Sequence, residues 1–128
     1  MRNAADYLGH IKALIMLNRQ VLRWKVMREQ AQGDVGLFRY QLTLRDGSLL
    51  QMFERFGVAE EKLQVTKYGF HWQSADGKLH KRWDNASHRP EVSTHPHHVH
   101  DGGDANVLGH GPITAEEVLA IIAAEVPE

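Results

Sequence analysis

The fold of this chain is restricted most strongly by segments in which apolar and polar residues alternate, separated by short glycine turns. Between Phe38 and Leu44 every second residue is apolar, which matches the two-residue side-chain period of a β-strand. Asp46-Gly47 and Asp76-Gly77 are typical of the tight turns that join antiparallel strands. These signals predict a meander of about five antiparallel strands, over residues 21–28, 37–44, 48–56, 62–73 and 79–84.

Helical patterns flank this series of strands. Asn3 can cap a first helix that ends near Leu17, and the apolar side chains between them recur at helical spacing. Thr114 and Glu117 form a capping box, which predicts a short C-terminal helix with an apolar face. Residues 85–111 show little periodicity, and we expect a histidine-rich loop there, or a short edge strand flanked by loops.

The predicted fold class is therefore α+β. It combines an N-terminal helix, an antiparallel meander of about five strands and a short C-terminal helix, with the histidine-rich loop before that last helix. We expect one domain that spans residues 1–128. The helices should cover one face of the sheet and leave the other face partly polar and free to bind a ligand.

The composition excludes several classes of protein. Without cysteine, the chain can form neither disulfide bonds nor thiolate zinc sites. The longest apolar run near the start, residues 13–17, is too short to span a bilayer, so we expect no membrane insertion and a cytoplasmic location. The net charge of −1 is not the bulk basic signature of a nucleic-acid-binding protein. Lys and Arg are nevertheless concentrated in residues 2–55, whereas residues 101–128 contain neither.

The distribution of histidine is the least even feature of the sequence. Eight of the nine histidines lie between His71 and His110. In the last two predicted strands, the two-residue period places a set of polar side chains opposite the aromatic ones. The Asp-Gly turn makes these strands neighbours, so the polar set should line one surface: Lys67, His71, His80, Arg82 and Asp84.

This surface, together with the loop that follows it, suggests chemistry on a phosphate ester. Arginine presents a planar set of donors to phosphate oxygens, and a histidine beside a carboxylate can act as a general acid or base. Such a site can cleave RNA without a metal ion. We expect Lys67, His71 and His80 to bind substrate. The candidate catalytic residues are Arg82, Asp84, His88, His98 and His100.

A metal centre is an alternative for the same loop. In an extended segment His98 and His100 would share a face, with His97 opposite, and imidazole binds zinc, nickel, copper or iron. The sequence lacks standard zinc motifs such as His-Glu-x-x-His. We therefore expect no cofactor, with a divalent transition metal held by His97, His98 and His100 as the alternative.

The sequence resembles the TumE family, the toxin components of bacterial type II toxin–antitoxin systems. The resemblance extends from about Asp6 to Ile122. Two departures are Arg89, where the family usually has a second histidine, and His95, where it usually has phenylalanine; the first bears on any catalytic role of that histidine pair. The matching features are residues 45–50 with Glu54, Lys67-Tyr68 with His71, residues 82–86 with His88, Pro90-Glu91, Thr94 leading into Pro96-His97-His98 and His100, and Val118-Leu119.

The resemblance implies a small toxin, encoded beside a helix-turn-helix antitoxin that binds and silences it, and RNA is a candidate target. Three hypotheses for its function stay open. The chain is a metal-independent ribonuclease toxin, a non-catalytic module that captures a partner through its sheet face or an edge strand, or a histidine-ligated metalloprotein. A homodimer is compatible with each of these hypotheses.

Overall fold

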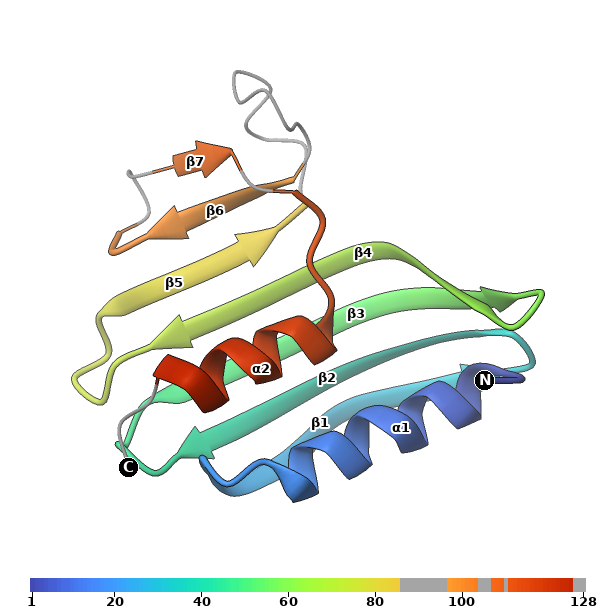
Figure 1. Ribbon diagram of the computed structural model, residues 1–128, viewed down its shortest axis with the longest axis horizontal. Coiled ribbons are helices and arrows are strands. Elements are labelled where there is room, and N and C mark those ends of the chain that lie inside the picture. Colours follow the sequence, from blue (N-terminus) through green and yellow to red (C-terminus); the bar gives the residue numbers. More distant parts are fainter. Residues whose placement is uncertain (86–96, 104–106, 110, 126–128) are drawn as a thin grey trace.

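The structure is a computed structural model that describes residues 1–85, 97–103, 107–109 and 111–125 (Figure 1). The strands form one antiparallel sheet in which each strand pairs with the next along the chain, from β1 to β7. The elements in chain order are α1 (Ala4–Leu17), β1 (Val21–Gln32), β2 (Val35–Leu44), β3 (Leu49–Ala59), β4 (Lys62–Gln73), β5 (Leu79–Asp84), β6 (His98–Asp101), β7 (Val107–Gly109) and α2 (Ala115–Glu125).

The predicted α+β meander is confirmed, and the sheet extends further than the sequence indicated. The described residues form seven strands, because β6 and β7 come from the segment expected to be a loop or a short edge strand. Neither strand has a run of alternating apolar residues, so each depends on pairing with its neighbour, β6 with β5 and β7 with β6, rather than on local sequence. β1 also continues four residues beyond its predicted end, as far as Gln32.

The predicted Asp-Gly turns are confirmed as hairpin turns. Gly47 and Gly77 both have a φ of +86°, a left-handed conformation that glycine adopts without steric cost. A third hairpin, between β3 and β4, turns at Glu60 and Glu61, whose φ angles are +52° and +63°. This turn uses neither glycine nor asparagine, so no residue pattern in the sequence predicts it.

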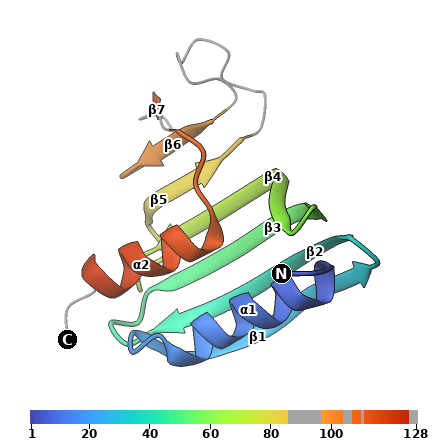
Figure 2. The ribbon, with the colours of Figure 1, turned by 45° about the vertical axis from the view of Figure 1, so that its right-hand side comes forward.

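Both helices pack on the same face of the sheet, which we call the inner face (Figures 1 and 2). The cap of α1 is as predicted, with the Asn3 side chain accepting a hydrogen bond from the backbone N–H of Asp6 at 2.9 Å. The predicted capping box before α2 is also present, because the Glu117 carboxylate accepts from the Thr114 N–H at 3.2 Å. None of the helices among the described residues is long and apolar enough to cross a membrane.

The core lies between the helices and the inner face. Each fully buried aliphatic side chain there contributes about 1.5–3 kcal/mol to stability. One buried side chain in this layer is ionisable: Glu54, with no exposed surface, lies between Met52 and Phe56 along β3. The fully buried apolar residues of the sheet and helices include Phe38, Tyr40, Leu42, Leu44, Leu50, Met52, Phe70, Ile11, Ile15, Val118 and Ile122.

The opposite face, which we call the outer face, has no helix over it in the described part of the chain (Figures 1 and 2). Side chains alternate between the two faces except where the pairing register shifts. Two such shifts occur in β1, between Val21 and Arg23 and between Val26 and Arg28. Strict alternation over residues 21–28 would place Leu22, Trp24 and Val26 together on one apolar side. In the structure Trp24 packs against Tyr40 on the inner face, whereas Leu22 is 51% exposed.

Candidate functional site

The register of β5 with β6 brings four polar residues together on the outer face. Asp84 pairs with His98, and Arg82 pairs with His100. Between these pairs, Trp83 and Val99 point to the inner face and are buried in the core. The two-residue period therefore turns all four polar side chains the opposite way.

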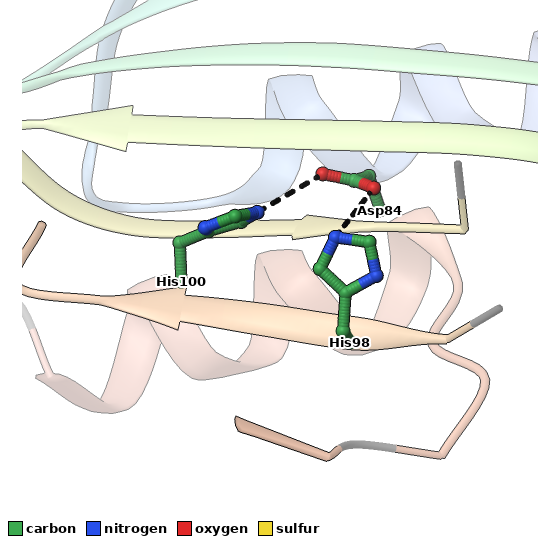
Figure 3. Close-up of side chains that lie close together, drawn as sticks. All are labelled: Asp84, His98 and His100. Atoms are coloured by element: carbon green, nitrogen blue, oxygen red, sulfur yellow. Dashed lines mark ion pairs between the residues drawn. The ribbon is translucent and has the colours of Figure 1, made fainter. Parts of the chain in front are cut away.

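These four side chains are close enough to interact directly, and Figure 3 shows three of them: Asp84, His98 and His100. Oδ1 of Asp84 lies 2.9 Å from Nε2 of His98, and Oδ2 of Asp84 lies 3.7 Å from Nε2 of His100. Nε of Arg82 is 3.4 Å from the same Oδ2. One carboxylate thus faces two imidazoles and a guanidinium, and we call Arg82, Asp84, His98 and His100 the outer-face cluster.

The contact between Arg82 and His100 fixes the protonation of one ring in this arrangement. A guanidinium nitrogen of Arg82 lies 2.9 Å from Nε2 of His100. Because a guanidinium can only donate, Nε2 of His100 must be the acceptor, and the ring proton is then on Nδ1. Nε2 of His100 therefore has no proton to donate to Asp84, and its hydrogen-bond partner is Arg82.

The members of the cluster differ in their access to solvent. The side chains of His98 and His100 are 0% and 1% exposed, whereas those of Asp84 and Arg82 are 13% and 29% exposed. Gly69, which pairs with Asp84 from β4, has no side chain, and a Cβ added there would meet no atom within 4 Å. Arg82 and Asp84 are therefore the groups that a substrate can reach.

The structure brings together most of the residues predicted to be catalytic. Arg82, Asp84, His98 and His100 form the outer-face cluster, while His88 lies outside the described residues. Of the predicted substrate-binding residues, His71 pairs directly with Arg82 on the outer face. Lys67 lies on the same face and is exposed.

His80 is not part of this group, contrary to the expectation from simple alternation. The register between β4 and β5 shifts at this point, because Trp72 pairs with Lys81 and Gln73 pairs with Leu79. This bulge turns His80 towards the aromatic side, where its ring lies 4.2 Å from that of Trp72 between centroids.

The potential metal ligands that the structure brings together also differ from the predicted set. His97 points to the face opposite His98, as its position in an extended segment suggested, and its Nδ1 lies 3.0 Å from the Tyr68 hydroxyl. Burial raises the pKa of Tyr68 to about 12, so this hydroxyl keeps its proton. Asp84 takes the place of His97 among the three potential ligands. One atom each from Asp84, His98 and His100 lies within 4.8 Å of the others.

Sequence reasoning missed a second ionisable site, the buried carboxylate of Glu54. It accepts hydrogen bonds from the Tyr7 hydroxyl of α1 and from the backbone N–H of Ala115, the latter at 2.9 Å, at the start of α2. Burial raises the pKa of Glu54 to about 7. The available signal was a single acidic residue at an inward position of an otherwise apolar strand.

Comparison with known proteins identifies the family. A family model described as Toxin TumE matches residues 11–128, which include every strand, α2 and the whole outer-face cluster. The chain belongs to the TumE toxin family. The resemblance in sequence is thereby confirmed, and this TumE protein is the toxin component of a toxin–antitoxin system, with an antitoxin as its partner. No curated protein and no solved structure matches the chain.

Proposed function

We propose that this TumE protein is a cytoplasmic toxin that cleaves RNA without a metal ion at the outer-face cluster. The observation that carries the proposal is a solvent-reachable arginine beside a carboxylate that lies 2.9 Å from the buried His98 imidazole. Arg82 can bind a phosphate through its planar set of donors. The two nearly inaccessible rings are positioning residues: His98 orients Asp84, and His100 orients Arg82.

The proposed reaction is an intramolecular transesterification. Asp84 accepts the proton of a ribose 2′-hydroxyl, whose oxygen attacks the adjacent phosphorus while Arg82 binds the phosphate oxygens. The bond from phosphorus to the 5′-oxygen breaks, leaving a 2′,3′-cyclic phosphate. The 5′-oxygen takes up a proton, and we assign its donation to His88, a predicted catalytic residue that lies outside the described residues. His71, opposite Arg82 in the sheet, remains a predicted contact to the substrate.

Cleavage of a labelled RNA in the presence of EDTA tests this function. The wild-type protein should cleave it and leave a 2′,3′-cyclic phosphate end. Asp84→Asn should lower the rate by about a hundredfold or more, because the general base is lost. Asp34→Asn, which changes an exposed carboxylate in the turn between β1 and β2, should cleave at the wild-type rate. A folded wild-type protein that leaves RNA intact would overturn the proposal.

A metal centre is the second candidate, favoured by the three potential ligand atoms of Asp84, His98 and His100. Two histidines and one carboxylate are a donor set that suits divalent transition metals. Arg82 opposes it, because its guanidinium lies beside both His100 and Asp84 and would repel a cation. Metal analysis of tag-free protein separates the two candidates: one equivalent of metal, lost in His98→Ala, together with activity that EDTA abolishes, would favour the metalloprotein.

We further propose that the antitoxin is a helix-turn-helix protein encoded by the neighbouring gene. The support is the family relationship together with β1, an edge strand that has no neighbour on its outer side in the described sheet. An exposed edge can pair with an extended segment of a partner or with a second copy of the chain. Co-expression with the neighbouring gene product should relieve growth arrest, and the mass of the purified toxin will show whether it is a homodimer.

A further inference from the structure

The outer face away from the cluster has an unusual charge pattern. The register of β1 to β4 places six exposed cationic side chains on it, and we call them the basic face. Acidic side chains of the same strands point elsewhere: Glu29 and Glu54 lie on the inner face. The basic face consists of Arg23, Lys25, Arg28, Arg39, Arg55 and Lys67.

Two cross-strand pairs within the basic face join like charges. Arg28 pairs with Arg39, and Arg55 pairs with Lys67, each directly opposite the other in the sheet. Like charges in this position repel each other and destabilise a sheet. No described carboxylate forms an ion pair with any of these four residues. The arrangement is therefore best suited to a bound polyanion, which would neutralise the repulsion.

An aromatic ring lies in the middle of the basic face. Phe53 pairs with Arg39 from the neighbouring strand and is partly exposed, and the Arg39 guanidinium lies 4.7 Å from the centre of its ring. Aromatic rings next to arginines on an open sheet provide stacking surfaces for unpaired bases. An acidic protein segment would match the charges, but its acidic side chains would not stack on the Phe53 ring as a base does.

The basic face is continuous with the outer-face cluster. Along β4 the outward positions run from Lys67 through Gly69 to His71, and the last two pair with Asp84 and Arg82. The absence of a side chain at Gly69 leaves room beside Asp84. A nucleic-acid strand lying across the basic face would therefore reach the carboxylate without crossing a part of the sheet that other described residues cover.

We propose that the basic face binds single-stranded RNA and delivers it to Asp84 and Arg82. Single-stranded RNA is thus the substrate class, and the basic face is its path to the cluster. This proposal rests on the proposed function, because delivery has a role only if the cluster cleaves RNA. Phosphates contact the six cations, and at least one base stacks on Phe53. Double-stranded RNA, whose bases are stacked on one another, should bind less tightly because it cannot use this ring.

Binding can be measured without cleavage by using Asp84→Asn as the background and a fluorescent single-stranded RNA as the probe. Adding Arg39→Gln and Arg55→Gln should weaken binding by about tenfold or more at moderate salt, and should reduce the dependence of log Kd on log salt by about 0.7 for each lost phosphate contact. A matched control, Arg2→Gln with Lys78→Gln, removes two exposed cations away from this face and should leave Kd unchanged. Phe53→Leu should weaken binding without changing the salt dependence.

The outcomes separate this inference from the proposed function. Equal RNA affinity of the Arg39/Arg55 variant and the control would overturn the basic face as the binding surface, whether or not the wild type cleaves RNA. Tight, Arg39-dependent binding by a protein that never cleaves RNA would support the face and refute the ribonuclease. Unchanged RNA affinity together with lost binding of the co-expressed antitoxin would assign the face to an acidic protein instead. Equal affinity for duplex RNA would overturn the preference for single strands.

Discussion

Glu54 offers the most direct test of how burial affects the pH dependence of stability, because its carboxylate is buried between two helices and the sheet. The perturbation is Glu54→Gln, which replaces an ionisable group by a neutral one of nearly the same shape. The amide oxygen can still accept from the N–H of Ala115, and the amide nitrogen can donate to the Tyr7 hydroxyl. The substitution should therefore remove the ionisation and keep the contacts.

The expected magnitude follows from the pKa of Glu54, which burial raises from 4.5 to about 7. Between these values the folded protein keeps a proton that the unfolded chain has released, so the free energy of unfolding falls as the pH rises. One pKa unit corresponds to about 1.4 kcal/mol, which gives a loss of about 3 kcal/mol by the time Glu54 is ionised in the folded state. Below 4.5 and well above 7 this group contributes no further pH dependence.

Urea unfolding at several pH values between about 4 and 8 measures the effect. The free energy of unfolding of the wild type, minus that of Glu54→Gln, should fall by about 3 kcal/mol across this range, and the histidines cancel because both proteins contain them. Glu29→Gln is the control, since it removes a partly exposed carboxylate that also accepts from a tyrosine hydroxyl, Tyr40. A wild type and a Glu54→Gln variant with parallel pH profiles would refute the reasoning.

Three further predictions concern the sheet and α1. Gly69→Val should fill the space beside Asp84 and lower RNA cleavage by about tenfold or more, whereas Gly57→Val, at the far end of the outer face, should leave the rate unchanged. Arg28→Gln should raise stability by a few tenths of a kcal/mol, about the cost of its like-charge pair with Arg39, and thermal unfolding can detect it. Gly9→Ala, in an exposed position of α1 with open space around it, should stabilise the protein by about 0.5–1 kcal/mol in urea unfolding.

Local signals explain which parts of the fold could be predicted from sequence. The Asp-Gly turns act over a few residues, and the caps of Asn3 and Thr114 bond to backbone groups within the same turn of helix. These features therefore predict directly where the hairpins turn and where the helices begin. The two-residue period of β4 and β5 then placed His71 and Arg82 on one face correctly.

The rest depends on pairing between segments, which no single segment encodes. β6 is four residues long and is paired in one register with β5, so the contact of Asp84 with His98 could not be read from either strand alone. The bulge at His80 has the same origin, because an extra residue in a strand is visible only against its partner. Glu54 was overlooked since an inward acidic residue becomes meaningful only once two helices are known to bond to it.

Because the imidazoles of the outer-face cluster are buried, alanine substitutions there cannot assign catalysis. His98→Ala should destabilise the protein by about 2–3 kcal/mol, since it opens a cavity and removes the partner of a poorly exposed carboxylate. Loss of toxicity in that variant would therefore have two explanations. His98→Gln resolves them, because its amide nitrogen can occupy the place of Nε2 and donate to Asp84 without being able to transfer a proton.

If His98 only positions Asp84, the glutamine variant should restore most of the RNA cleavage and growth arrest that the alanine variant loses. Circular dichroism and urea unfolding of both variants show whether each is folded under assay conditions. A glutamine variant that is folded and as inactive as the alanine variant would mean that His98 itself moves a proton. The solvent-reachable pair, Arg82 and Asp84, would then not be sufficient, and the substrate would have to reach a ring that is 0% exposed in this structure.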